Sequence, residues 1–344
     1  MHLQIKSKIN KEIIHFAEAD RVISSKYRTI TDQNGTACRK IKLPESLIYK
    51  PFGLLRLSRR MLRLDKCNVF PVGDNLVIIR RGLVYFYDNA TDQLRVTLQL
   101  KNCRNVLHQS INSTPEGYIY FGEYGANTDR TEVPVYCSKD GGRSWINIYT
   151  FPAKSIKHIH GCYYDRFTDK IWVCTGDFKD ENWLLVADRE FKEVHKIGDG
   201  QQKFRTCNII FTEKEVHWLM DSQLEPSYHI ILDRKTEQIT TGKKFLGPVW
   251  YIKELTDGYY LSATTQEIGA GVLDDKVNLY ISTDLKEWNI LHVFDHDGFP
   301  KRYFKFGVIG FADGRQSSKD FYMFFEAVKG FDGKSVTCAL TSGK

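Results

Sequence analysis

Two histidines placed two positions apart are the residues of this chain best suited to chemistry. They are His158 and His160, and a second apolar stretch that ends in Asp177 follows them. Residues two apart in a strand project to the same side, so both imidazoles would face one site. Such a pair can transfer protons or bind a metal.

Acidic residues recur at the matching position of four consecutive repeats. Each follows the second strand of its repeat: Glu123, Asp177, Asp221 and Glu267. The first strands of these repeats begin near His108-Gln109, His158, Arg205 and Trp250-Tyr251. First and second strands are antiparallel, so the start of one and the end of the other share a face. We therefore expect these side chains to crowd one mouth of a central channel.

The residue types at this face indicate roles. The catalytic candidates are His158, His160, Asp177, Glu123, Tyr124 and Glu267. The substrate-binding candidates are Arg130, Arg205, Asp221, His108, Gln109, Trp250 and Tyr251. Arginine binds carboxylates in a bidentate manner, and the aromatic rings can stack on sugars.

The ligand spacing identifies no metal. The prediction is that no cofactor is required. The alternative is a divalent metal held by the histidines together with His108, Gln109, Asp177 or Glu123.

A repeat positions these residues. Tight turns that contain aspartate recur at Asp88, Asp140, Asp188, Asp233 and Asp284, which gives spacings of 52, 48, 45 and 51 residues. This is the length of one four-stranded blade with its loops. With one unit added at each end, the sequence predicts an all-β fold: a single β-propeller of seven four-stranded antiparallel blades, with six as the alternative count.

The predicted propeller covers residues 1–344. Its approximate blades are 12–48, 68–101, 106–152, 158–196, 205–241, 248–292 and 305–341. A linker helix is expected at about 52–64, where Leu54, Leu57, Met61 and Leu64 recur at helical spacing. A stripe of arginines from Arg56 to Arg63 lies beside them, and we expect it to be a solvated basic face. At most, this stripe would make a weak peripheral contact with a membrane.

The most specific motif is Ser138-Lys139-Asp140-Gly141-Gly142-Arg143-Ser144-Trp145. It matches the pattern S-x-D-x-G-x-[ST]-W at every fixed position, and Ser282–Trp288 is a shortened relative. Here the chain resembles the Asp-box (BNR-repeat) propellers, which include sialidases and related glycan-active proteins. The resemblance implies that the Asp box is a structural turn between the third and fourth strands of a blade.

Composition narrows the setting. The formal charge of +7 is spread over 344 residues, without a nucleic-acid recognition motif. The N-terminus lacks a signal-peptide pattern, and no apolar run reaches the length of a membrane span. The eight cysteines form no CxxC pair, which is typical of free thiols in a reducing compartment. We therefore expect a cytoplasmic protein that does not bind nucleic acid.

Three functions fit these residues and the resemblance, all directed at a poly- or oligosaccharide, expected to be acidic. The first is a sialidase-like glycoside hydrolase, which needs two carboxyl groups. The second is a lyase acting on uronate polymers through histidine, tyrosine and arginine. The third is a propeller that binds glycan without turnover. Glycosidic bond cleavage by hydrolysis is placed first, although the F-R-I-P segment of true sialidases has no good match.

Overall fold

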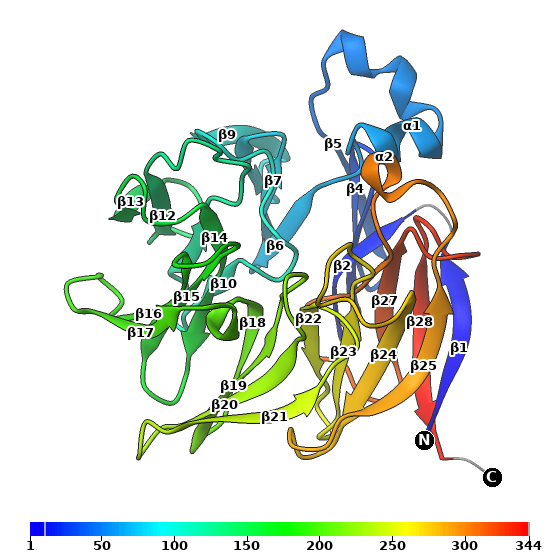
Figure 1. Cartoon of the computed structure of the whole chain (residues 1–344). Coiled ribbons are helices and arrows are strands. Elements are labelled where there is room, and N and C mark those ends of the chain that lie inside the picture. Colours follow the sequence, from blue (N-terminus) through cyan, green and yellow to red (C-terminus); the bar gives the residue numbers. More distant parts are fainter. Residues whose placement is uncertain (10–11, 343–344) are drawn as a thin grey trace. The chain divides into compact units, whose positions relative to one another are not determined.

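The chain forms seven four-stranded antiparallel sheets in a computed structural model that describes residues 1–9 and 12–342 (Figure 1). Six sheets follow the chain strand by strand, and one combines both ends of the sequence. The protein is a seven-bladed β-propeller, so the predicted fold class is confirmed. The blades fall into two compact units, described separately below.

The first unit spans Cys67–Phe245 and contains four blades. Apolar side chains such as Val135, Ile159 and Val173 fill the space between its sheets. Its strands are β6 (Asn68–Val72), β7 (Asn75–Arg80), β8 (Leu83–Asp88), β9 (Gln93–Gln99), β10 (Asn112–Ser113), β11 (Ile119–Gly122), β12 (Val133–Ser138), β13 (Ile146–Phe151), β14 (His158–Asp165), β15 (Lys170–Gly176), β16 (Asn182–Ala187), β17 (Val194–Gly200), β18 (Thr206–Phe211), β19 (Glu215–Met220), β20 (Tyr228–Asp233) and β21 (Ile239–Lys244).

The second unit combines Met1–Lys66 with Leu246–Lys344 and contains three blades. Two of them follow the chain: β2 (Ile13–Glu18), β3 (Arg21–Lys26), β4 (Thr29–Asn34) and β5 (Ala37–Lys42), and then β22 (Val249–Glu254), β23 (Tyr260–Thr264), β24 (Lys276–Ser282) and β25 (Asn289–Asp295). The third contains β26 (Val308–Phe311), β27 (Phe321–Glu326), β28 (Ser335–Thr341) and β1 (His2–Ile9).

Strand β1 completes the last blade from the other end of the sequence. It runs antiparallel to β28, with His2 opposite Thr341 and Ile9 opposite Ser335. The sequence-based boundaries give this blade residues 305–341 alone and leave residues 2–9 outside any blade. The missing fourth strand is therefore supplied by a pairing across almost the whole chain.

The aspartate turns join the third and fourth strands of five blades. In the Asp140 turn, Oδ1 accepts hydrogen bonds from Ser144 N–H at 2.9 Å and Ser138 Oγ at 2.8 Å. Gly142 N–H donates to Ser138 Oγ at 2.7 Å, and its φ of 92° favours glycine. A Cβ at Gly142 would lie 2.3 Å from Val77 Cγ2, so the turn also has no room for a side chain. The motif is built as a structural turn.

The helical segment corrects the sequence-based prediction. It contains η1 (Leu47–Tyr49), η2 (Pro51–Gly53) and α1 (Arg56–Met61), while η3 (Gln202–Phe204) and α2 (Lys301–Phe304) lie elsewhere. Arg59 and Arg60 are buried, whereas Leu54, Leu57 and Met61 are exposed. The expected solvated basic face is therefore wrong, because the arginines point inward to acidic partners. Within the described residues, no helix combines the length and apolar character that crossing a bilayer requires.

The cysteines make no disulfide. All eight are free, and all except Cys38 are buried. Burial raises the pKa of Cys162 and of Cys174 above the usual range of a thiol, so these two are structural apolar groups.

Candidate functional site

The histidine pair lies at the start of β14, and a β-bulge there sets the direction of the two side chains. The pairing of β14 with β15 shifts register between Ile159 and Gly161, which makes His160 the extra residue. Both rings are almost fully buried, and their Nε2 atoms lie 3.1 Å apart. The first strands β18 and β22 also shift register near their starts, so the bulge is a repeated feature of these blades.

Asp177 joins the pair directly after the end of β15. Its Oδ1 lies 3.2 Å from His158 Nε2 and 3.1 Å from His160 Nε2. The Nδ1 atoms face the carbonyl oxygens of Gly125, at 2.7 Å, and Thr206, at 2.9 Å. A carbonyl only accepts, so each Nδ1 carries the proton and each neutral ring presents an unprotonated Nε2 to Asp177.

The lone pairs of His158 Nε2, His160 Nε2 and Asp177 Oδ1 thus converge on one point. A single proton placed there would be held by all three acceptors, so the trio is built to accept a proton. Burial lowers the pKa of His158, against the opposing hydrogen bond and charge of Asp177. The lowered pKa keeps the His158 ring neutral at neutral pH, so this ring is available to act as a base. The same three atoms are also close enough together to hold a metal ion.

Two cations bind the Asp177 carboxylate from the other sides. Arg205 Nη2 lies 3.1 Å from Oδ1, and Lys157 Nζ lies 2.5 Å from Oδ2. Burial alone would raise the pKa of Asp177, but its contacts with His158 and His160 and the charge of Arg205 hold it far below its usual range. Asp177 therefore stays ionised and cannot serve as a general acid.

Arg205 extends the cluster to the next blade. Its Nη2 lies 3.4 Å from Asp221 Oδ2, and its Nη1 donates to Gln223 Oε1 at 2.6 Å. Cys207 Sγ donates to the same Asp221 oxygen at 3.1 Å. Burial, followed by the Asp221 charge, raises the pKa of the Cys207 thiol well above its usual value. Asp221 is thus fully committed within the protein.

The histidine–aspartate cluster, as we call it, consists of His158, His160, Asp177, Arg205 and Asp221. Sequence reasoning missed three residues that support it: Lys157, Gln202 and Cys207. Gln202 Nε2 donates to the Asp177 carbonyl at 2.9 Å and is fixed by Ser222 through its own oxygen. No local sequence signal marks Gln202, because its partners lie 25 and 20 positions away.

The accessible edge of the cluster is aromatic and cationic. Tyr124 is half-buried, and its ring lies 4.2 Å from the His158 ring and 5.9 Å from the His160 ring. Next to Asp177, Phe178 is exposed and lies between two cations, with Lys157 at 5.4 Å and Arg130 at 5.5 Å from the ring centroid. Arg130 is itself paired with Glu181 at 2.5 Å. Phe178 was not among the sequence-based candidates.

Glu123 does not join the cluster, although it stands at the matching strand end. Its two oxygens accept from Lys101 N–H at 2.8 Å and Asn102 N–H at 2.9 Å, and Tyr136 Oη donates at 3.0 Å. These bonds fix the loop at residues 101–102 and occupy both oxygens of the carboxylate, so Glu123 has a structural role. The half-buried residues His108 and Gln109 lie on the loop before β10, where Gln109 Oε1 accepts from Asn208 Nδ2 at 3.2 Å.

Three sequence-based candidates belong to the other unit. Glu267 Oε1 accepts from Trp250 Nε1 at 3.1 Å and from Thr265 Oγ1 at 2.9 Å. Trp250 packs edge-on against Phe306, and Tyr251 is buried in the core. These contacts support a packing role: Glu267 binds residues of its own blade, and Trp250 also packs on the segment that leads into β26.

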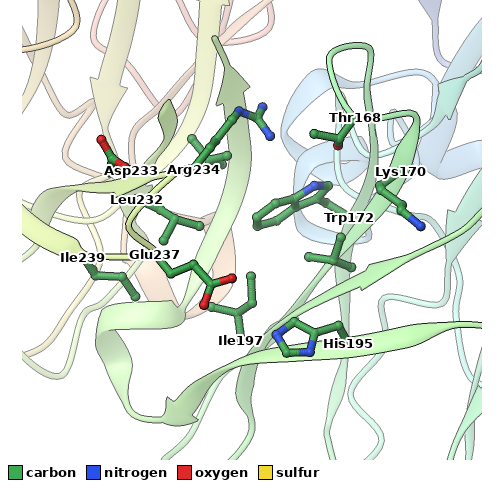
Figure 2. Close-up of a pocket in the computed structure, with 12 residues that line it drawn as sticks. Thr168, Lys170, Trp172, His195, Ile197, Leu232, Asp233, Arg234, Glu237 and Ile239 are labelled. Atoms are coloured by element: carbon green, nitrogen blue, oxygen red, sulfur yellow. The ribbon is translucent and has the colours of Figure 1, made fainter. Parts of the chain in front are cut away.

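A hollow lies in the first unit, at the opposite end of β15 from Asp177 (Figure 2). Its volume is about 350 Å³, within the size range of small-molecule sites. Figure 2 shows Trp172 facing Leu232 and Glu237 across the hollow. The buried Trp172 Nε1 has no hydrogen-bond partner. None of the sequence-based candidates lines this hollow, because its residues come from the ends of strands near the aspartate turns.

Comparisons with known proteins show the fold and no closer relationship. No family model matches the chain. No curated protein matches it either. Among solved structures, Ycf48 from Cyanidioschyzon merolae has a TM-score of 0.58 at 10% identity, over 98% of this chain and 99% of its own.

Two further structures are of longer chains, of which this chain matches only a part. The extracellular domain of the putative one-component system BT4673 from B. thetaiotaomicron has a TM-score of 0.57 at 9% identity over 100% of this chain, which spans 40% of that domain's chain. The tricorn protease has a TM-score of 0.50 at 13% identity over 98% of this chain, which spans 36% of it. At these identities the likeness shows a β-propeller fold alone.

Proposed function

We propose that this chain is a carbohydrate-active propeller that cleaves an acidic poly- or oligosaccharide at the histidine–aspartate cluster. The observation that carries the proposal is the convergence of His158 and His160 on Asp177, beside an exposed ring flanked by two cations. The Asp-box turn at Ser138–Trp145 supports placing the chain among the sialidase-like propellers.

The geometry favours elimination over hydrolysis, which reverses the order taken from the sequence. A two-carboxylate hydrolase needs one carboxyl group that is protonated when the substrate arrives. Asp177 stays ionised, Glu123 is held by three donors, and Asp221 is bound by Arg205 and Cys207. These carboxyl groups leave no suitable general acid, whereas the histidine pair is a competent proton acceptor.

The elimination would proceed as follows. The histidine pair takes the proton on the sugar carbon next to the carboxylate, and the electron pair left behind forms a carbon–carbon double bond. The glycosidic bond on the adjacent carbon then breaks. The leaving oxygen takes a proton from Tyr124, which recovers one from water. Lys157 and Arg130, which pair with Asp177 and Glu181 in the structure, would turn toward the substrate carboxylate when it binds, while Phe178 would support the sugar ring.

No cofactor is required in this mechanism. A divalent cation bound by His158, His160 and Asp177 is the alternative, since the three atoms suit one. We favour a proton, because Lys157 and Arg205 already neutralise Asp177 and a dication would leave the site strongly positive. Activity should therefore survive dialysis against a chelator.

The test is a panel of acidic and neutral polysaccharides, with polygalacturonate, alginate and heparan sulfate among the acidic ones. Near-ultraviolet absorbance detects an unsaturated uronate, and reducing ends are measured in parallel. We expect absorbance with at least one acidic polymer, loss of it in His160→Ala, and retention in His195→Ala, which removes an exposed histidine outside the cluster.

Other outcomes would reject elimination. Reducing ends without absorbance would indicate a hydrolase. Saturable binding of a glycan without any product would indicate a binding propeller. Equal loss of activity in both histidine variants would show that the cluster is not the reacting site.

A further inference from the structure

The segment between β5 and β6 exposes an unusual number of apolar side chains. Over residues 47–61 the exposed ones are Leu47, Ile48, Phe52, Leu54, Leu55, Leu57 and Met61. Leu54 is 81% exposed and Leu47 is 75% exposed, so these are not residues at the margin of a core. Single exposed apolar residues need no explanation, but seven within 15 residues mark a surface that contacts something. We call residues 47–61 the apolar segment.

The segment is anchored from beneath by its own arginines. Arg56 binds Asp332 through two hydrogen bonds of 3.0 and 2.9 Å and also binds Asp65 at 2.7 Å. Arg60 is 3% exposed and pairs with Asp297. The arginines therefore hold the leucines outward, and the exposure of the leucines is part of how the segment is built.

The surroundings of the apolar segment are basic and aromatic. Lys50 is exposed within the segment, and exposed Lys40 and Lys42 lie on β5, which leads into it (Figure 1). Glu45 is the only acidic residue between positions 43 and 64. Helix α2 contacts α1 and carries exposed Arg302 and Tyr303.

We propose that the apolar segment docks this protein on the surface of an anionic lipid bilayer, with its leucines in the acyl boundary and its lysines at the headgroups. This proposal does not depend on the proposed activity. Leucine and phenylalanine beside lysine and arginine are the composition of segments that lie in a membrane interface. Anionic headgroups attract such basic residues.

A bilayer suits this surface better than a protein groove. In Figure 1 the segment lies beyond the end of β4 and β5 as a series of helical turns. A protruding segment with apolar side chains at its surface can enter a bilayer without needing a shaped partner. The charge of the flanking lysines matches anionic lipid, whereas a second copy of this chain would bring the same positive charge.

The experiment is sedimentation of the full chain with vesicles. Vesicles of phosphatidylcholine with phosphatidylglycerol are compared with vesicles of phosphatidylcholine alone. We expect binding to the anionic vesicles, and a reduction of more than about tenfold in Leu54→Glu/Leu55→Glu, which loses two apolar contacts and gains two negative charges. Val96→Glu/Ile146→Glu is the matched control, since both residues are exposed apolar positions on other blades and should leave binding unchanged.

Three results would overturn the proposal. The first is a wild-type chain that does not sediment with the anionic vesicles. The second is equal binding by the segment variant and the wild type. The third is a dimer, measured by light scattering, that the segment variant dissociates while neither protein binds vesicles, which would assign the surface to a second copy. Circular dichroism of each variant checks that the fold is intact.

Discussion

The histidine–aspartate cluster and the apolar segment depart from the usual distribution of side chains in opposite ways. The cluster buries five ionisable residues, and the segment exposes seven apolar ones. In the cluster, every buried charge has a partner inside the protein. The attraction within these ion pairs offsets the free energy that is lost when the charges leave water. In the segment, the apolar side chains stay exposed, and the contact that we propose to cover them comes from outside the chain.

The difference shows how a buried polar site and a docking surface can be told apart. A site that acts on its own ligand keeps its charged groups ordered before the ligand arrives. A docking surface leaves its apolar groups exposed to solvent until a partner covers them. Disturbing the first should therefore affect stability strongly, while disturbing the second should affect stability weakly and association strongly.

The largest effect on stability should come from Arg205→Met. This change removes the cation shared by Asp177 and Asp221 and leaves two buried carboxylates with fewer partners. We expect a loss of about 3–5 kcal/mol in the free energy of unfolding. Denaturant titration measures it, with Arg95→Met, on the partly exposed outer strand β9, as the control. A loss below about 1 kcal/mol would mean that the cluster does not depend on its ion pairs.

Arg60→Ala should have the next largest effect, confined to the apolar segment. It leaves Asp297 without its bidentate partner, and the expected loss is about 1–3 kcal/mol. Limited proteolysis should show cleavage within residues 47–61, which Lys50→Ala should not cause because Lys50 is exposed. If cleavage does not increase, the arginines do not hold the segment in place.

Acid should weaken the cluster next. The folded pKa of His158 is lowered, so between that value and the unfolded value of about 6.5 the unfolded chain binds more protons. Stability is therefore fully present above about pH 6.5 and is lost as the pH falls through the folded pKa, by about 1.4 kcal/mol for each pH unit that separates the folded pKa from the unfolded pKa. Thermal melts at pH 7.5 and 5.5 compare the wild type with His158→Gln, which should lose part of this dependence.

The lowered pKa of His158 also predicts the pH profile of the proposed reaction. His158 must be unprotonated to accept a proton, so activity should be constant near neutral pH and fall only below about pH 6.5. An acid limb above pH 7 would indicate a different base.

The smallest effect on stability should come from the apolar segment itself. Leu54→Ser should change the free energy of unfolding by less than about 0.5 kcal/mol, because the side chain is exposed. Leu184→Ala, in the core of the first unit, should cost about 2–5 kcal/mol. Similar losses in both variants would mean that Leu54 is packed against the fold in solution.

The repeat was predictable because its signal is local. Each aspartate turn carries its own hydrogen-bonding chemistry within a few residues, so the periodicity of Asp88 to Asp284 reveals the blades. Strand β1 was not predictable in this way, since its partner β28 lies at the other end of the sequence. The prediction that the arginine stripe faces solvent was wrong for the same reason. The acidic partners of the arginines, Asp297 and Asp332, lie more than 200 positions away in the sequence.

The candidate site was predictable only in part. Strand-end register placed His158, His160, Asp177, Arg205 and Asp221 among the candidates, and the structure brings these five together. Glu123 occupies the same register position, yet nearby N–H groups claim its carboxylate. Register gives the face on which a side chain lies, but not which neighbours have already used its hydrogen-bonding capacity. Gln202 was missed because its contacts cross between loops.

The pairing of β1 with β28 has a consequence for how the protein is made. Strand β1 is synthesised before β28, and residues His2–Ile9 must wait for Ser335–Thr341 before their blade can close. At roughly 5–20 residues per second, that wait lasts on the order of half a minute. During synthesis β1 has no neighbour until β28 appears, whereas β27 already pairs with β26. The lysines at positions 6 and 8 suit this interval, because charged edge strands resist pairing with the wrong chain.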